Sequence, residues 1–153
     1  MLSIKSVLCP TDFSPQSQSA TQAALDIARR LGAKLMLLHV IDDPVVYFPM
    51  MESYPLPTRE QLETYAEERL ENWIPDSDRG DLQIQHFWIH GQPAEEIVKF
   101  ASKSKADMIV MATHGRRGVP RFLLGSVSEN VCRYASCPVL MHRAKNNPAR
   151  SPQ

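Results

Sequence analysis

Five short apolar segments alternate with helix-patterned segments along almost the whole chain, and this alternation limits the possible folds more than any other feature. The apolar segments are the kind that form buried strands. We expect strands at residues 4–10, 33–41, 82–89, 106–113 and 137–143. Strands and helices that alternate in this way form an α/β fold with right-handed crossovers. The sequence therefore predicts a five-stranded parallel, doubly wound, Rossmann-like sheet with helices on both faces.

Local signals mark the ends of the helices between these strands. Ser14 followed by Pro15 predicts a helix start, and Gly32 predicts the end of that helix. Thr58 with Gln61 matches a capping box. The helix after Thr58 is expected to carry an apolar stripe on one face, made of Leu62, Tyr65, Ala66, Leu70 and Trp73. A further helix is expected after Gly91 and Pro93, and the alternating pattern of the segment at 82–89 predicts a strand near a sheet edge.

The composition argues against several classes of protein. The 153 residues suffice for one domain, which we place at residues 1–144 and follow with a tail at 145–153 that we expect to be disordered. Seventeen Lys and Arg balance seventeen Asp and Glu, which argues against a general nucleic-acid binder. No apolar run approaches the ~18 residues of a membrane span, and the N-terminus does not match a signal peptide. We therefore expect no membrane and no nucleic acid among the partners.

The three cysteines, Cys9, Cys132 and Cys137, indicate reduced thiols in the cytoplasm, because their number is odd and no export signal is present. Cys132 and Cys137 lack the C-x-x-C spacing of a redox or metal pair. Buried apolar thiols are therefore favoured over a metal site, and no metal ligands or catalytic residues are assigned.

The segment at residues 42–57 is irregular. Its four prolines exclude a regular element, and its aromatic and methionine side chains show no periodicity. It either packs on the domain's own edge or forms a lid or partner surface.

Two loops with unusual chemistry follow strand ends. Pro10, Thr11 and Asp12 come after the first strand, and a glycine-rich loop begins at Met111 after the fourth. Ligands of doubly wound sheets bind at the carboxyl ends of the strands, where the strand order reverses. If the two strands are neighbours at that point, these loops face the same site.

The glycine-rich loop has the parts of a phosphate cradle. Gly125 and Ser126 stand at a helix start, where Ser126 with Glu129 matches a second capping box and unpaired N–H groups favour anions. Gly115 and Gly118 add backbone freedom, and the loop supplies three positive charges, from Arg116, Arg117 and Arg121. Taken singly, the glycines are better explained as turn glycines, Ser126 as a helix cap, the arginines as a solvated surface and His114 as a loop histidine. Their combination favours phosphate binding, although neither a Walker motif nor a dinucleotide fingerprint is present.

At this point the chain resembles the universal stress protein family. That family carries a glycine, two residues, a second glycine, nine residues, and then glycine with serine or threonine. Gly115, nine residues and Gly125-Ser126 match the latter part, while Ala112 replaces the first glycine. The Pro10-Thr11-Asp12 element and Leu38-His39-Val40 also match the family, so the similarity runs along nearly the whole chain. Since Ala112 lies at a strand end, we expect it to adopt a strand conformation with little strain.

The resemblance implies an adenine nucleotide alpha hydrolase-like fold and binding of ATP or AMP. By position, Gly115, Gly125, Ser126, Val127 and Ser128 would surround the phosphates and ribose, Thr11 and Asp12 would lie near the nucleotide, and Val40 and Met111 would contact adenine. The full set of candidate nucleotide-binding residues is Pro10, Thr11, Asp12, Val40, Met111, Ala112, His114, Gly115, Arg116, Gly125, Ser126, Val127 and Ser128. Asp12 could hold Mg²⁺ through bound phosphates.

The resemblance also implies a homodimer joined along the last strand, at residues 138–143, and a role in stress resistance. The expected function is that of a dimeric, nucleotide-binding stress-response or regulatory protein with little or no turnover. Two alternatives remain open, a slow ATP hydrolase and a nucleotide-independent dimerisation module.

Overall fold

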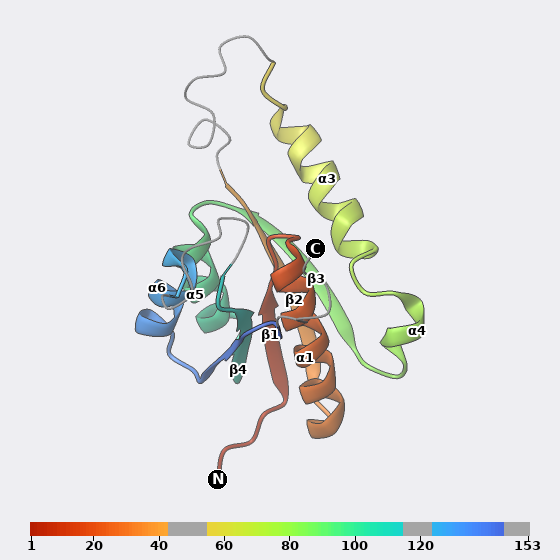
Figure 1. Cartoon of the computed structure of the whole chain (residues 1–153), viewed down its shortest axis with the longest axis vertical. Coiled ribbons are helices and arrows are strands. Elements are labelled where there is room, and N and C mark those ends of the chain that lie inside the picture. The colour runs from red at the N-terminus through yellow and green to blue at the C-terminus, as the bar shows by residue number, and fades with distance from the viewer. Residues whose placement is uncertain (43–54, 115–123, 146–153) are drawn as a thin grey trace, which may run out of the picture.

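The structure is a computed structural model that describes residues 1–42, 55–114 and 124–145. Strands and helices alternate along the chain as the sequence predicts (Figure 1). In chain order the elements are β1 (Ser6–Pro10), α1 (Pro15–Leu31), β2 (Lys34–Ile41), α3 (Arg59–Glu71), α4 (Asp76–Arg79), β3 (Ile84–His90), α5 (Pro93–Lys103), β4 (Met108–Ala112), α6 (Ser126–Tyr134) and β5 (Val139–His142). The short helix α4 was not predicted.

All five strands pair in parallel, in the order β3-β2-β1-β4-β5. The predicted five-stranded parallel sheet is therefore confirmed. The strand that starts at Ile84 lies at one edge, as its alternating pattern predicts, and β5 lies at the other. The order reverses between β1 and β4, which are neighbours in the middle of the sheet.

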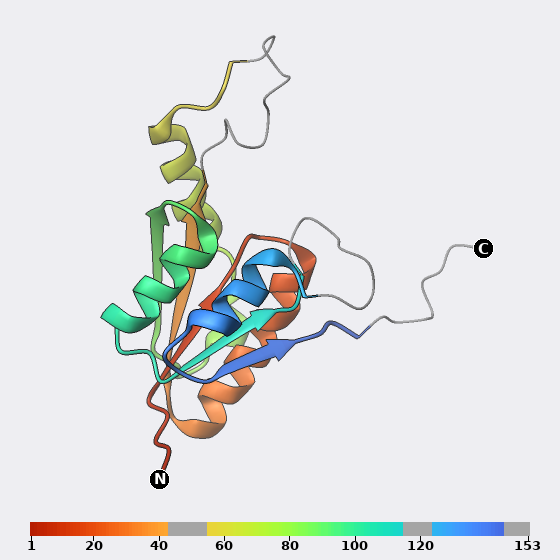
Figure 2. The same ribbon diagram turned by 90° about the vertical axis from the view of Figure 1, so that its left-hand side faces the viewer.

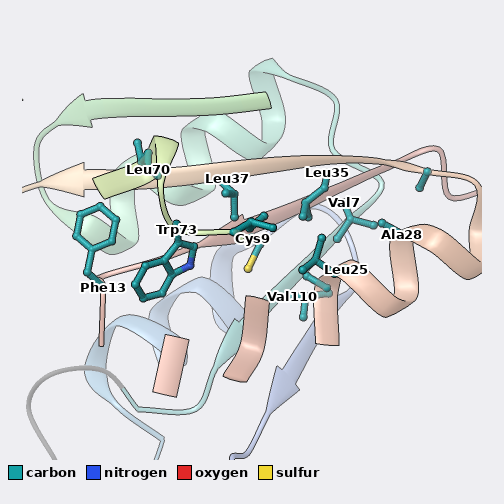
Figure 3. Packing of buried hydrophobic residues seen from close by; sticks show 13 residues of the cluster. Val7, Cys9, Phe13, Leu25, Ala28, Leu35, Leu37, Leu70, Trp73 and Val110 are labelled. Atoms are coloured by element: carbon teal, nitrogen blue, oxygen red, sulfur yellow. The ribbon is translucent and has the colours of Figure 1, made fainter. Parts of the chain in front are cut away.

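The sheet is covered on both faces (Figures 1 and 2). Side chains that alternate along each strand feed two separate apolar clusters. Cys9 and Leu37 point to the cluster shared with α1, α3 and Trp73, shown in Figure 3. Leu8 and Leu38 point to the cluster shared with α5 and α6. A double-sided core of this kind explains why the central strands are apolar almost throughout.

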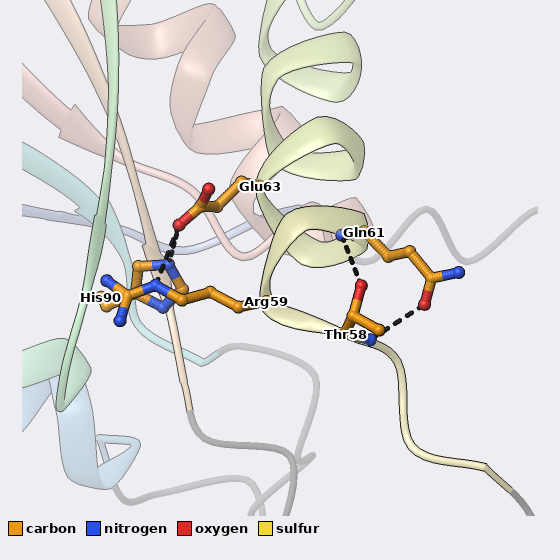
Figure 4. Close-up of polar contacts among 5 residues, drawn as sticks. All are labelled: Thr58, Arg59, Gln61, Glu63 and His90. Carbon is orange, nitrogen blue, oxygen red and sulfur yellow. Dashed lines mark hydrogen bonds and ion pairs between the residues drawn. The ribbon is translucent and has the colours of Figure 1, made fainter.

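The predicted ends of α1 and the start of α3 are confirmed. Ser14 caps α1 by accepting a hydrogen bond from the Ser17 N–H, and Gly32 ends the helix in the left-handed conformation at φ 64°. Thr58 and Gln61 form the reciprocal capping box at the start of α3 (Figure 4).

The predicted apolar stripe of α3 is wrong in two places. Trp73 lies beyond the end of the helix, and Tyr65 is 47% exposed, whereas Ala66 and Leu70 are buried. The reason is geometric, since the first turns of α3 extend past the body of the sheet and have little to cover (Figure 1).

The first turns of α3 are held by polar contacts instead. The Glu63 carboxylate accepts hydrogen bonds from His90 Nε2 at 2.7 Å and from Arg59 Nε at 3.1 Å (Figure 4). The bond from His90, and then that from Arg59, lower the pKa of Glu63 below its ordinary value. His90 ends β3, so this pair ties α3 to the edge strand.

Candidate functional site

The candidate site lies at the carboxyl ends of β1 and β4, where the strand order reverses. The two strands pair only through Val7 with Met108 and Leu8 with Ile109. Beyond Ile109, β4 continues to Ala112 beside β5, while β1 continues to Pro10 beside β2. The two strands therefore separate at the position where such folds bind ligands.

Pro10 explains why the sheet divides here. The Thr11 N–H donates to the Leu38 carbonyl of β2 at 2.8 Å, so position 10, one residue earlier, faces β4. Proline has no N–H to donate in that direction. The predicted site residue Pro10 thus ends the hydrogen-bond ladder between β1 and β4.

The turn that follows β1 is held by its own side chains. Thr11 Oγ1 accepts a hydrogen bond from the Phe13 N–H at 3.0 Å and lies 3.0 Å from Ser17 Oγ. The Asp12 carboxylate accepts one from the Ser14 N–H at 3.0 Å. Thr11 is buried, whereas Asp12 is half-buried. Of the two predicted residues, Thr11 thus shapes the turn and Asp12 is the more exposed.

The loop after β4 returns to the strand end at Gly125. The Gly125 N–H donates to the Thr113 carbonyl at 2.8 Å, and a Cβ on Gly125 would lie 3.3 Å from that same oxygen. The φ of Gly125 is an ordinary −61°. Glycine is therefore favoured here by close packing against the backbone, and not by an unusual conformation.

Ala112 lies in β4 and pairs with His142, so its predicted strand conformation is confirmed. The methyl group that replaces the family's first glycine therefore adds little strain.

The start of α6 differs from the prediction. Gly125 is the N-cap and Ser126 is the first helical residue, so the predicted capping box of Ser126 and Glu129 is wrong. No side chain caps this helix within the described residues. The Gly125 N–H donates to the Thr113 carbonyl and so holds the N-cap residue beside the end of β4. The first N–H groups of α6 have no acceptor within the helix, and Ser126, the first helical residue, is exposed.

Ser128 joins α6 to the end of β4. Its hydroxyl is buried and lies within hydrogen-bond distance of two carbonyl acceptors, Ala112 at 2.8 Å and Thr113 at 3.0 Å. This contact fixes the helix start beside the strand end, in addition to the ligand role that the family resemblance implies.

Val40 and Met111 lie at the carboxyl ends of β2 and β4, which flank β1. Both belong to the apolar cluster below α5 and α6, and their exposed fractions are 9% and 5%. The half-buried Val127 packs against the same cluster. These residues form a small apolar margin, that is, a narrow apolar surface at the edge of the site.

His114 is half-buried, and its Nδ1 lies 3.1 Å from the Thr113 hydroxyl. Gly115 and Arg116 lie outside the described residues, as do Arg117, Gly118 and Arg121. Most of the irregular segment at 42–57 and the tail from residue 146 also lie outside them.

Sequence reasoning missed an aromatic group beside the β1 turn. The Phe13 ring stacks on His39 with the ring centres 4.3 Å apart, and Trp73 contacts Phe13 edge-on. The sequence shows no periodicity that joins these positions, because they come from a turn, a strand end and the segment after α3. The only available signal was Phe13 itself, a large apolar residue next to polar Asp12 and Ser14.

Within the described residues, no group of three or more His, Cys, Asp or Glu side chains is arranged to hold a metal ion. Among the same residues, no helix is both long enough and apolar enough to cross a membrane.

Comparison with known proteins identifies relatives along the whole chain. A family model described as the universal stress protein family matches residues 3–143. The universal stress protein MJ0531 of Methanocaldococcus jannaschii is 39% identical over 138 residues, which are 90% of this chain and 81% of that protein.

Solved structures agree with this relationship. The structure of MJ0577, from the same archaeon, is 31% identical, has a TM-score of 0.79 and covers 95% of this chain and 99% of that one. A universal stress protein of Archaeoglobus fulgidus in complex with dAMP is 21% identical, with a TM-score of 0.64 and coverage of 92% and 98%. At that identity the second structure supports the fold alone.

Proposed function

Because the chain belongs to the universal stress protein family, we propose that it binds an adenine nucleotide, ATP or AMP, where β1 and β4 separate. The phosphates lie at the start of α6, and the protein acts as a dimeric stress-response or regulatory protein with little or no turnover. The cytoplasm is the proposed location, because the three cysteines are free thiols.

This proposal rests mainly on the start of α6, which no side chain of the described residues caps. Gly125 donates its N–H to the Thr113 carbonyl, and the first N–H groups of α6 that follow it have no acceptor within the helix. A helix start that carries unpaired N–H groups and a partial positive charge attracts phosphate. We expect Asp12, in the turn after β1, to act on bound phosphates through Mg²⁺.

Two solved structures that share this fold are complexes with adenine nucleotides. The Archaeoglobus fulgidus protein is a complex with dAMP, and another universal stress protein structure, 23% identical, is a complex with cAMP. Both ligands contain an adenine base and a single phosphate group. ATP and Mg²⁺ are proposed here from the family resemblance and from Asp12.

The helix start cannot provide the affinity alone. Its charge interaction contributes ~0.3–1 kcal/mol and at most about 2 kcal/mol. Micromolar binding requires roughly 8 kcal/mol. We expect the rest to come from several N–H bonds and from the apolar margin formed by Val40 and Met111.

Replacement of Ser126 by proline tests the phosphate site with little risk to the fold. Proline is favoured at the first position of a helix, and the extended conformation of Gly125, with ψ 156°, suits a residue before proline. Ser126→Pro removes one N–H and the hydroxyl, whereas the matched Ser126→Ala removes the hydroxyl alone.

Calorimetric titration with ATP and AMP should show binding about tenfold weaker for Ser126→Pro than for Ser126→Ala, since a hydrogen bond to a charged group contributes ~1.5–3 kcal/mol. Equal affinity of the two variants would show that the helix start is not part of the binding site.

The dimer is proposed to form along β5, which is a sheet edge in the described chain. Of its residues, Leu140 is 36% exposed, while Val139 and Met141 pack against the core. An edge strand with an exposed apolar side chain is a surface that a second copy can cover.

A further inference from the structure

Phe13 has an unusual backbone conformation. Its φ is +63°, in the left-handed region that large side chains rarely adopt. Phe13 lies in the turn directly after Asp12. A bulky residue keeps such a conformation only where its surroundings fix it, and such residues gather at ligand sites.

The surroundings of the Phe13 ring are aromatic. The ring is 7% exposed and stacks on His39, with the two planes inclined by 26°. Trp73 and Tyr65 contact it edge-on, with ring centres 5.4 and 6.0 Å away. Figure 3 shows Phe13 beside Trp73 and Leu70 at the end of this cluster. The ring is thus fixed by β2, by α3 and by the segment after α3.

Arg69 extends this group to the surface. It lies in the last turn of α3, and its guanidinium carbon lies over the Phe13 ring at 5.1 Å. The same carbon lies 5.8 Å from the Tyr65 ring and 5.7 Å from the Trp73 ring. A cation over an aromatic face is attracted by the ring. Arg69 therefore holds the end of α3 against Phe13.

The same residues set the hydrogen bonds of the turn. His39 Nδ1 lies 2.8 Å from the Thr11 carbonyl, and since a carbonyl can only accept, this nitrogen donates. The Phe13 N–H donates to the Thr11 hydroxyl, and the Ser14 N–H donates to the Asp12 carboxylate. The left-handed conformation at Phe13 turns the chain so that these bonds form together. The orientation of Asp12 therefore depends on where the Phe13 ring is held.

We propose that Phe13 is the positioning residue of the nucleotide site, and that Arg69 couples the docking of α3 to nucleotide binding through it. This inference rests on the proposed function. When α3 is docked, the Phe13 ring is fixed and Asp12 is oriented for the bound phosphates. By linkage, nucleotide binding stabilises the docked position of α3 to the same extent.

The first test replaces Arg69, which is exposed and should not be needed for folding. Arg69→Met keeps an unbranched apolar side chain and removes the guanidinium charge. The matched control is Arg30→Met, an exposed arginine in the last turn of α1, at the opposite end of the sheet. Calorimetry should show ATP binding about two- to fivefold weaker for Arg69→Met, as expected from the loss of one exposed cation–π contact, and unchanged for Arg30→Met.

The second test separates positioning from general destabilisation. Phe13→Leu keeps an apolar side chain and removes the ring, and it should weaken ATP binding at least as much as Arg69→Met. In the Phe13→Leu background, Arg69→Met should have no further effect, because its contact with the turn is already lost. If the fold loss of affinity in the double variant is the product of the losses in the two single variants, Arg69 does not act through Phe13.

The fluorescence of Trp73 tests the reverse effect, that of nucleotide binding on the docking of α3. In the Trp88→Phe background, which leaves Trp73 as the only tryptophan, ATP should change the tryptophan emission, and Arg69→Met should reduce that change. Wild-type protein that fails to bind ATP would overturn the proposed function itself. Wild-type binding combined with unchanged affinity in the Phe13 and Arg69 variants would overturn only this inference.

Discussion

Cys9 shows how strongly the interior of this protein determines the chemistry of a single residue. Its side chain is fully buried in β1 and its sulfur lies 3.7 Å from the Thr21 hydroxyl. Burial raises the pKa of the Cys9 thiol to about 12, although the hydrogen bond with Thr21 lowers it. Since the thiolate is the reactive form, Cys9 should be inert in the native protein.

A thiol titration with Ellman's reagent at about pH 8 checks this expectation, because an unperturbed thiol has a pKa of about 8.5. The expectation of a buried thiol is wrong for Cys132, which is exposed and should react first. Cys137, whose thiol pKa is raised by partial burial, should react more slowly. Cys9 should react only after the protein is unfolded. Three rapid equivalents from native protein would contradict the buried position of Cys9.

At the scale of elements, Asp107 fastens β1 to β4 at the amino end of the sheet. Its Oδ2 lies 2.9 Å from each of three donors, which are the Lys5 N–H, the Ser6 N–H and the Ser6 hydroxyl. These bonds, first that from Lys5, lower the pKa of Asp107 below its ordinary value. Asp107→Asn should therefore reduce the free energy of unfolding at neutral pH by roughly 1–2 kcal/mol.

The stabilisation by Asp107 should decrease as the pH falls. A carboxyl group whose pKa is lower in the folded state stabilises the protein above its unfolded pKa of about 3.9. The stabilisation is lost as pH falls through the lowered folded pKa. Urea unfolding should therefore show the wild type and Asp107→Asn converging below about pH 4. A difference in stability that persists undiminished at that acidity would exclude the charge of Asp107 as its cause.

The elements were predicted well because their signals are local. The Ser14 cap, the Gly32 stop and the Thr58 capping box each depend on residues within one or two helical turns. The parallel order followed from the alternation of strands and helices. That β1 and β4 are neighbours was only a condition for a shared ligand site, and the structure meets it.

The parts of the candidate site that sequence reasoning missed depend on contacts between distant residues. Ser126 has a capping box in its own sequence, but the bond of Gly125 to the Thr113 carbonyl moves the helix start by one residue. The stacking of Arg69 on Phe13 joins residues that are far apart in the chain. Neither contact leaves a periodic pattern, so only the three-dimensional structure shows them.

At the scale of the whole molecule, the two edges of the sheet differ. The edge at β3 has α3 tied to it through Glu63 and His90, whereas β5 presents the exposed Leu140. A dimer along β5 should therefore break when Leu140 is replaced by glutamate, since like charges would meet across the strand pair. Light scattering after size exclusion should give a monomer mass for Leu140→Glu.

The matched control for the dimer is Leu31→Glu, because Leu31 is 50% exposed at the end of α1 and away from β5. This variant should retain the mass of a dimer. Leu140→Glu protein that also elutes as a dimer would place the interface elsewhere. Val139 is a poorer choice for this test, since it packs against the core.

The proposed adenine-nucleotide site lies at the point where β1 and β4 separate. The most direct measurement is the amide NMR spectrum of isotope-labelled, ligand-free protein titrated with ATP. We expect saturable shifts at Asp12, at Ala112 and His114, and at residues 125–128, with smaller shifts at Arg69 through Phe13. A spectrum that ATP leaves unchanged, or shifts confined to α4 and the far end of α1, would contradict the proposed site.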